Sequence, residues 1–545
     1  MDSQLLLLCA FIYAAILFYI AWRSEFWQFK QAWVQPVLYS LSLAVYCSSW
    51  TFLGAVGQAV DNGWSFLPIY LGPILLFLLG WRFLRRLLVI SSRNKVTSIA
   101  DFIGSRYGKS QSLAAIVTLV AVLGSLPYIA LQLKAVSLVW STIQLPIVDG
   151  VIELSTEVNK HGSSFVTALV MACFAILFGT RVIDGPHRHQ GMITTIAFES
   201  LVKIIVFFII GLLAIQLLVG DGVERSFSIA PLIENSRFDL NFVTQSFLAM
   251  VAVVCLPRQF HVMVVEYHSR KDIRTARWLF PLYLALISLI IVPIAIASQQ
   301  LLSHQQYSSD AYVLLLPMMQ GSQWLTSLAF IGAISAATGM VVVAAVTLSI
   351  MISNELVVPL WLWLSSRSDM AAGNLGERLR LVRRISIVVV LLLAWLLELN
   401  FSQSQALASI GLISFAAAAQ LMPAIIGALY WQRGHRNGVL TGLMLGVFFW
   451  FYCFLLPSVL GQGHSLVLNG PWHLAWLSPI NLLGTGGMGQ LSHGVFWSLL
   501  FNFAGFIMVS KYSRFNSLDL RQANSFTQLR RRYSFQQYDF DLTGI

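Results

Sequence analysis

Long apolar segments recur along this chain from its first residues almost to its end, and they restrict the fold more than any other feature. A helix needs about 20 apolar residues to span the hydrocarbon core of a bilayer. A transmembrane β-barrel shows ten-residue segments of alternating polarity instead, whereas the segments here are continuously apolar. Because a helix satisfies its own backbone hydrogen bonds in lipid, the sequence predicts an all-α integral membrane protein.

Charged side chains are too scarce to cover a water-soluble surface. The 545 residues are 57% hydrophobic and 10% charged, whereas a soluble domain carries about 25% charged residues. The five cysteines lie in or beside apolar runs without CxxC or Cys/His spacing, so neither a disulfide framework nor a zinc site is predicted. The first apolar run lacks a basic leader and a small-residue cleavage site, which favours a retained helix over a signal peptide.

We predict about thirteen transmembrane helices from these segments. Their approximate cores are 4–22, 35–58, 65–89, 112–140, 163–180, 191–219, 241–262, 278–299, 324–353, 384–400, 404–430, 438–460 and 490–511. Alternate loops are basic, and the members of this set include Arg82, Arg85, Arg86, Arg270, Lys271, Arg274, Arg378, Arg380, Lys511 and Arg514. The opposite set holds only Lys160, Arg225 and Arg237. Because Lys and Arg mark cytoplasmic loops, this places the N-terminus in the periplasm and the C-terminus in the cytoplasm.

The second span carries a polar cluster near its middle, and polar groups in hydrocarbon are costly unless they have a purpose. The cluster comprises Cys47, Ser48, Ser49, Trp50 and Thr51, followed by two glycines. A broken helix here would offer carbonyls and half-helix ends to an ion or a zwitterion. Close helix packing through small residues is the alternative.

Glu199 and Lys203 in the sixth span lie on one helix face because they are four residues apart. They form either an ion pair that only positions the helix or a functional pair. In the functional interpretation, Glu199 binds the coupling cation or takes up a proton, and Lys203 keeps it ionised.

The seventh span contains Pro257, which removes a backbone donor and predicts a kink. The next residues are Arg258 and Gln259. Arg258 either holds a substrate carboxylate bidentately or anchors the cytoplasmic end of the helix. Other spans supply further polar groups that could face the same cavity: Tyr128 and Gln132 in the fourth, Ser335 and Thr338 in the ninth, and Ser414 in the eleventh.

Other chemistries find little support in the sequence. His187, Arg188 and His189 lack a third ligand nearby, so no metal site is predicted beyond a sodium ion. No phosphate-binding GxxxxGK[ST] loop is present. The chain shows no nucleophile–base constellation of an enzyme, and its net charge of +11 reflects the cytoplasmic loops, so no nucleic-acid partner is expected.

The stretch VTSIADFIGSRYG (96–108) resembles a signature of the sodium/solute symporter family, and the resemblance covers about residues 1–512. Within the family, the chain is most similar to the transporter-like input domain of CbrA-type histidine sensor kinases. The blocks that carry this likeness are YSLSLAVYCSSWTFLGAVG (39–57), FLPIYLGP (66–73), IAFESLVK (196–203), CLPRQFHVMVVE (255–266) and SAATGMVVVAAVTLSIMISNELVVP (335–359).

The resemblance implies a LeuT-type fold with a 5+5 inverted repeat, in which spans two to six and seven to eleven form the two halves. It also implies a central site between broken second and seventh spans, a bacterial inner-membrane location, and sodium- or proton-coupled uptake of an amino acid, with histidine suggested by the CbrA-type branch. Family members often carry a hydroxyl pair in the ninth span as sodium ligands. Here that position falls at Gly339 and Met340, and a shifted alignment offers Ser335 and Thr338.

These observations predict a cation-coupled secondary transporter, with Na⁺ or H⁺ as coupling ion and no other cofactor. The expected substrate-binding residues are Ser48, Ser49, Trp50, Thr51, Tyr128, Gln132, Arg258, Gln259 and Ser414. The expected ion-coupling residues are Glu199, Lys203, Cys47, Ser335 and Thr338. The alternative is a sensory module that binds solute and regulates a histidine kinase or response-regulator pathway. Residues 513–545 form a short basic tail that resembles the start of a signalling connector, with no kinase domain.

Overall fold

The computed structural model describes residues 3–27, 31–145, 147–148, 151–152, 160–179, 190–219, 230–234, 238–302, 307–364, 375–400, 406–461 and 463–528. Within them the chain is helical apart from turns and one two-stranded hairpin, β1 (Ile147–Val148) and β2 (Val151–Ile152), in which Ile147 pairs with Ile152. The all-α prediction is confirmed.

Eight helices or helix runs of the described chain are long and apolar enough to cross a membrane. They are α1 (Ser3–Ser24), α7 (Gln111–Ile143), α9 (Gln190–Val219), α13 (Arg270–Leu302), α15 (Gln323–Met351) with η6 (Ile352–Val357) and α16 (Val358–Leu364), α18 (Leu407–Ala419) with α19 (Met422–Tyr430), α20 (Arg436–Trp450) with η8 (Phe451–Leu455) and α21 (Leu456–Leu460), and α23 (Gln490–Tyr512). The chain is therefore a multi-pass membrane protein.

Two further spans are helix pairs bent sharply at a break. The second predicted span bends by 74° between two helical halves. The first half consists of α2 (Val34–Ser42) and η1 (Leu43–Tyr46), and the second of η2 (Trp50–Gly54), α3 (Ala55–Asn62) and η3 (Gly63–Phe66). In the seventh, α11 (Leu240–Cys255) meets α12 (Pro257–Phe260) and η4 (His261–Val265) at 56°. Leu256 is extended there, with ψ 128°, because a residue before proline disfavours the α region.

The remaining predicted spans are also helical. Segment 65–89 contains α4 (Pro68–Leu78) and α5 (Trp81–Arg93), segment 163–180 contains α8 (Lys160–Gly179), and segment 384–400 contains α17 (Leu375–Asn400). Shorter elements lie between the spans: α6 (Ile99–Arg106), α10 (Ala230–Glu234), η5 (Ser309–Ala311), α14 (Tyr312–Met319), α22 (Ser465–Asn469), and the 3₁₀ turns η9 (Pro471–His473), η10 (Ala475–Leu477), η11 (Leu482–Gly484) and η12 (Gly486–Met488).

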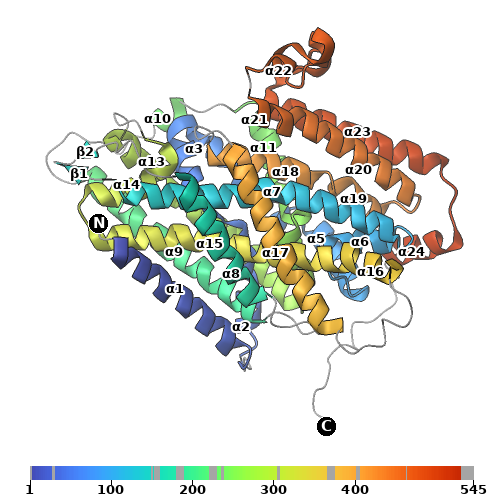
Figure 1. The fold of residues 1–545 in the computed structure, drawn as a ribbon, viewed down its shortest axis with the longest axis horizontal. Helices are drawn as coiled ribbons and strands as arrows, with labels where there is room; N and C mark the ends of the chain where they lie inside the picture. Colours follow the sequence, from blue (N-terminus) through green and yellow to red (C-terminus); the bar gives the residue numbers. More distant parts are fainter. Residues whose placement is uncertain are drawn as a thin grey trace.

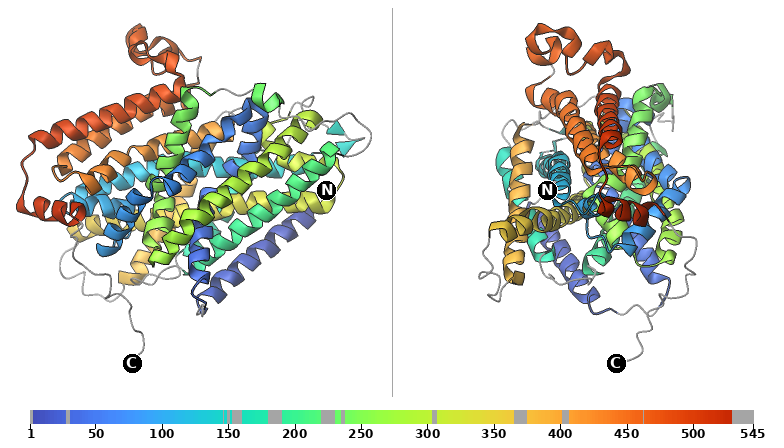
Figure 2. Two further views of the ribbon diagram at one scale, coloured as in Figure 1. Left: turned by 180° about the vertical axis from the view of Figure 1, so that it is seen from behind. Right: turned by 90° about the vertical axis from the view of Figure 1, so that its right-hand side faces the viewer.

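The long helices run roughly parallel, so that short elements gather at the two ends of the molecule (Figure 1). α1 lies along one edge beside α9, and α20 and α23 pack against each other along the opposite edge (Figure 2). The broken second span contacts α9 and α13, and the broken seventh contacts α15. Both breaks therefore lie inside the bundle.

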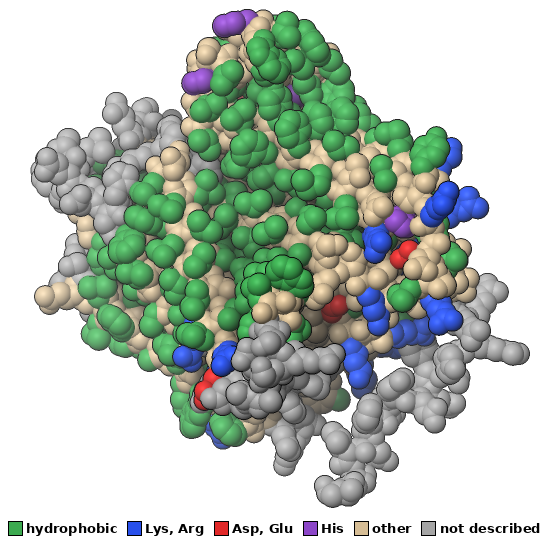
Figure 3. Space-filling view, turned by 45° about the vertical axis from the view of Figure 1, so that its right-hand side comes forward, with side chains coloured by type: hydrophobic (Ala, Val, Ile, Leu, Met, Phe, Trp, Pro, Cys, Tyr) green, Lys and Arg blue, Asp and Glu red, His purple; other side chains and the backbone are tan. Residues whose placement is uncertain are grey.

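The outer surface matches the one expected against lipid. Large apolar side chains such as Phe11, Leu79, Leu289 and Met444 are exposed. Figure 3 shows apolar side chains over most of the face in view, with Lys and Arg gathered toward one side of it. Exposure of so much apolar surface to water would be unfavourable, so this surface is expected to contact lipid.

The tail begins with α24 (Ser517–Thr527), which folds back on the ends of the spans. A capping box formed by Asn516 and Asp519 starts the helix. Phe526 is buried and its ring centroid lies 5.5 Å from that of Phe102 in α6. α24 also contacts α19, so this part of the tail belongs to the packed structure.

Candidate functional site

The break in the second span leaves main-chain carbonyls at the end of η1 that need donors from outside the helix. Lys203 of α9 supplies two hydrogen bonds, from its Nζ to the carbonyl oxygens of Ala44 at 3.2 Å and Cys47 at 2.8 Å. Gln259 supplies a third, from its Nε2 to the carbonyl oxygen of Leu43 at 3.0 Å. The two broken helices are thus linked directly.

α7 holds the other side of the same break. The hydroxyls of Ser48 and Tyr128 are 2.7 Å apart, and the Ser49 amide donates to Oε1 of Gln132 at 3.1 Å. Thr51 donates from Oγ1 to the carbonyl oxygen of Ser48 at 2.8 Å. These bonds fix an irregular backbone that, without partners, would be costly inside a membrane.

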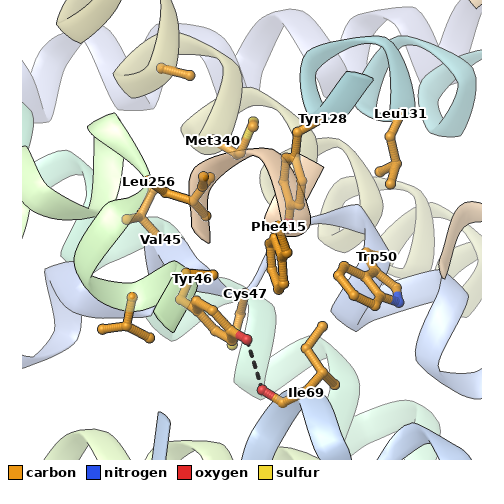
Figure 4. Packing of buried hydrophobic residues seen from close by; sticks show 14 of the residues in the cluster. Val45, Tyr46, Cys47, Trp50, Ile69, Tyr128, Leu131, Leu256, Met340 and Phe415 are labelled. Atoms are coloured by element: carbon orange, nitrogen blue, oxygen red, sulfur yellow. Dashed lines mark hydrogen bonds between the residues drawn. The ribbon is translucent and has the colours of Figure 1, made fainter. Parts of the chain in front are cut away.

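Four aromatic rings close around the break (Figure 4). The ring centroids of Tyr128 and Phe415 lie 5.6 Å apart and nearly parallel, and those of Trp50 and Phe415 lie 5.1 Å apart. Tyr46 completes the group at 6.2 Å from Phe415, with its hydroxyl donating to the carbonyl oxygen of Ile69 at 2.8 Å. The rings come from the second, fourth and eleventh spans and form a buried aromatic cluster.

Arg258 lies beneath this cluster rather than at an exposed helix end. Its side chain is 2% exposed, and its guanidinium carbon lies 4.1 Å from the ring centroid of Tyr128. Among the described residues, Nε and Nη2 of Arg258 have no hydrogen-bond partner, and neither has Oε1 of Gln259. A buried guanidinium with free donors is a site prepared for an anion, because Arg pairs bidentately with carboxylates.

Glu199 faces α15 instead of pairing with Lys203. Thr338 donates from Oγ1 to Oε1 of Glu199 at 3.1 Å, and Tyr13 of α1 donates to Oγ of the neighbouring Ser335 at 2.7 Å. Among the described residues the structure shows no ion pair between Glu199 and Lys203. Sharing a helix face does not bring them into contact, because the carbonyls of the break draw the ammonium away.

Gly339 makes room for the Glu199 carboxylate. A Cβ atom at position 339 would lie 2.1 Å from Oε2 of Glu199. The carboxylate therefore packs directly on the backbone of α15, at the position where the family pattern places a hydroxyl.

Ser414 lies in a helix contact, because its hydroxyl donates to the carbonyl oxygen of Gly124 in α7 at 2.5 Å. The other expected substrate-binding and ion-coupling residues lie at the two breaks or beside Glu199. The stretch His187 to His189 lies outside the described residues, and so do Arg225 and Arg237.

Comparisons with known proteins agree with this architecture. No protein-family model matches the chain. An uncharacterized symporter, YodF, of Bacillus subtilis (strain 168) is 24% identical over 440 residues, which cover 78% of this chain and 80% of the relative. The solved structure of a Na⁺-coupled sialic acid symporter in a substrate-bound outward-open state covers 93% of this chain and 98% of its own, with a TM-score of 0.64 and 12% identity. The chain has the fold of that symporter. The predicted LeuT-type fold is confirmed.

A crevice in this LeuT-type fold reaches Trp50 from the side of α3 and η3. Its lining includes Trp50, Gln58, Ser65 and Gln245, and the free space within it has room for about one water molecule. Because Trp50 also borders the aromatic cluster, the crevice reaches the edge of that cluster but is too small to hold a solute.

Sequence reasoning missed three contributors to the site, namely Tyr13, Tyr46 and Phe415. An aromatic residue in an apolar run looks the same whether it faces lipid or a binding site. The available signals were the positions of Tyr46 directly before Cys47 and of Phe415 directly after Ser414, beside polar residues already singled out.

Proposed function

We propose that the chain is a cation-coupled secondary transporter of a small amino acid, with histidine as the leading candidate. The observation that carries this proposal is Arg258, a buried cation with unpartnered donors beside two helix breaks. An amino acid carries the carboxylate that such a guanidinium would bind. The function of the YodF relative, a symporter by name, is consistent with it.

The aromatic cluster suits a solute with a flat ring. Tyr128 and Phe415 lie side by side, and Trp50 borders both. Offset stacking and edge-to-face contacts with aromatic rings contribute about 0.5–1.5 kcal/mol each beyond buried area. A histidine whose imidazole packed against the edges of these rings would place its carboxylate near Arg258, which lies against Tyr128, and its ammonium near the carbonyls and hydroxyls of the break.

The broken helices supply the moving parts. In this class of transporter, substrate and ion lie at helix breaks near the middle of the membrane, and one bundle rocks against the other around them. Lys203 links the break in the second span to α9, and Gln259 links the two broken spans to each other. Solute binding at the breaks would therefore alter contacts with the surrounding helices. We place the protein in a bacterial inner membrane, with a periplasmic N-terminus.

A sensory module is the second candidate, and the packing of α24 favours it. This helix joins the ends of the spans to the residues that follow, so a change in the helix bundle could be passed to a downstream partner such as a histidine kinase. Sensing and transport can coexist in one molecule.

A carboxylate test addresses the proposal directly. Purified protein is heated with a panel of amino acids and with the matching amides, for example histidine and histidinamide. Ligands that bind the folded state raise its melting temperature by mass action. We expect a rise with a free amino acid and none with its amide. The proposal is contradicted if an amino acid and its amide raise the melting temperature equally, or if no amino acid of the panel raises it.

A further inference from the structure

The Lys203 side chain ends where a half-helix ends. η1 stops at Tyr46, and the Cys47 amide closes its last turn by donating to the carbonyl oxygen of Ala44. The Lys203 ammonium donates to this same oxygen and to the carbonyl oxygen of Cys47, just beyond the end of η1. Carbonyls at the C-terminal end of a half-helix, together with the negative end of its dipole, are what broken-helix transporters use to bind an alkali cation. Here the Nζ atom of Lys203 already lies within hydrogen-bond distance of two of these oxygens.

From this geometry we infer that the Lys203 ammonium acts as a built-in cation at the broken helix, so that the chain binds and moves its solute without sodium. Both an ammonium and a sodium ion carry one positive charge and seek the same oxygens. Lys203 is 4% exposed, and its ammonium lies against the carbonyl oxygens of Ala44 and Cys47, where a sodium ion would bind. A second cation beside it would be repelled.

The opposing helix supports the same conclusion. A sodium ion between the two helices would need oxygens from α15 as well, yet position 339, next to Thr338, has no side chain and so offers no hydroxyl oxygen. The carboxylate of Glu199 occupies the space in front of Gly339 and accepts a hydrogen bond from Thr338.

One consequence rests on the proposed function: if the protein is a cation-coupled transporter that does not use sodium, its coupling ion is a proton. Four titratable groups lie near the ammonium or the helix that carries it: Glu199 on the same helix, Cys47 at the break, Tyr13 on α1 and Tyr283 on α13, whose hydroxyl donates to the carbonyl oxygen of Ser200. Glu199 is the carboxylate among them, and we expect it to take up the coupled proton while Lys203 keeps its charge.

The test compares sodium, potassium and choline chloride at equal ionic strength and pH, with two readouts. The first is the melting temperature of the protein without solute, and the second is the affinity for the amino acid that stabilises it. For the unmodified protein we expect the same melting temperature in all three salts and affinities that agree within about twofold. A sodium-specific rise in either quantity overturns the inference.

Lys203→Ala supplies the matched variant, because it removes the ammonium and leaves the carbonyls and Glu199. We expect its melting temperature to rise in sodium or methylammonium chloride relative to choline chloride. A folded Lys203→Ala protein that is indifferent to all small cations shows that the position is no cation site and overturns the inference. If the variant does not fold, the salt comparison on the unmodified protein still decides.

The two failures can be told apart. Absence of any amino-acid binding contradicts the proposed function but leaves the first readout intact, because sodium binding needs no solute. A sodium-specific melting shift contradicts the inference while leaving solute transport possible. Lys203→Arg, which keeps the charge but enlarges the head group, should remain indifferent to sodium.

Discussion

Arg258 is a buried positive charge that has no acidic partner among the residues that the structure describes. Its guanidinium is covered by the ring of Tyr128, and cation–π contact recovers only about 2 kcal/mol in a desolvated site. Removing a charge from water costs several kcal/mol, so the free protein carries an unfavourable group at this position. Such a cost is expected at a binding site, where the ligand supplies the missing charge.

Replacing Arg258 by methionine tests this balance. We expect Arg258→Met to keep or raise the melting temperature of the free protein, because the unpaired charge is gone. We expect it to lower amino-acid affinity about 30-fold or more, in line with the 2–5 kcal/mol typical of a lost charged hydrogen-bonded pair. Thermal unfolding with and without amino acid measures both effects. The exposed Arg270→Met serves as control, and an unchanged affinity in Arg258→Met contradicts the role.

Gly339 offers a steric test of the Glu199 position. A methyl group there would lie 2.1 Å from Oε2 of Glu199, so we expect Gly339→Ala to displace the carboxylate and to destabilise the protein by about 1–3 kcal/mol, as overpacking does. Gly487→Ala, where nothing lies within 4 Å of the added atom, is the control. Equal melting temperatures for the two variants are incompatible with the described contact.

At single positions the sequence indicated which residues belong to the site, but it did not predict what surrounds them. The i, i+4 spacing of Glu199 and Lys203 indicated a shared helix face, but it could not show that broken-helix carbonyls would attract the ammonium. Arg258 follows an apolar run, and that pattern fits an anchor at a helix end as well as a buried ligand. Only the packing of Tyr128 over its guanidinium distinguishes the two.

Among the elements, the two broken spans show how local sequence shapes the site. Pro257 restricts Leu256 to an extended conformation, and the sequence alone predicts this bend. The break at Cys47 has no proline, so it depends on tertiary partners: Lys203, Gln132 and Tyr128 satisfy the groups that the helix releases. Clustered hydroxyls in the sequence can suggest that a helix is broken, but they do not show where, because residues distant in the sequence stabilise the break.

The α24 helix is a second element with a testable role. Phe526 packs on Phe102 and is buried, and truncation of a buried Phe costs about 3–5 kcal/mol. We therefore expect Phe526→Ala to detach α24, which hydrogen exchange of residues 517–527 would show as a loss of protection. Leu520→Ala on the exposed side of the same helix should leave exchange unchanged. Full protection in both variants means that the helix docks by other contacts.

His435 at the start of α20 makes the α24 contact sensitive to pH. Burial holds the pKa of His435 below its ordinary value and outweighs Asp519, whose Oδ2 lies 3.7 Å from Nε2 of His435. The unfolded chain therefore binds this proton at a higher pH than the folded one, and stability falls as pH drops below about 6.5. We expect His435→Asn, whose amide oxygen can replace Nδ1 as acceptor for the Asn437 amide, to lose less stability between pH 7.5 and 5.5. Identical pH slopes would contradict this account.

For the whole molecule, hydrophobicity alone predicted most of the architecture. Each of the thirteen predicted segments contains a helix in the described residues, because a run of about 20 apolar residues has few alternatives in lipid. The arrangement of helices came instead from the family resemblance, since uniformly apolar helices such as α7 and α9 do not show which face is inward. Loop charges predict the orientation.

We propose that this bundle moves an amino acid against its gradient at the expense of a cation gradient. The direct measurement is accumulation of labelled histidine, followed by a panel of other amino acids, in proteoliposomes with an imposed proton gradient and no sodium. We predict accumulation above the external concentration that a protonophore abolishes and that Arg258→Met lacks. Specific binding of an amino acid without accumulation under either a proton or a sodium gradient would contradict transport and leave the sensory module as the function.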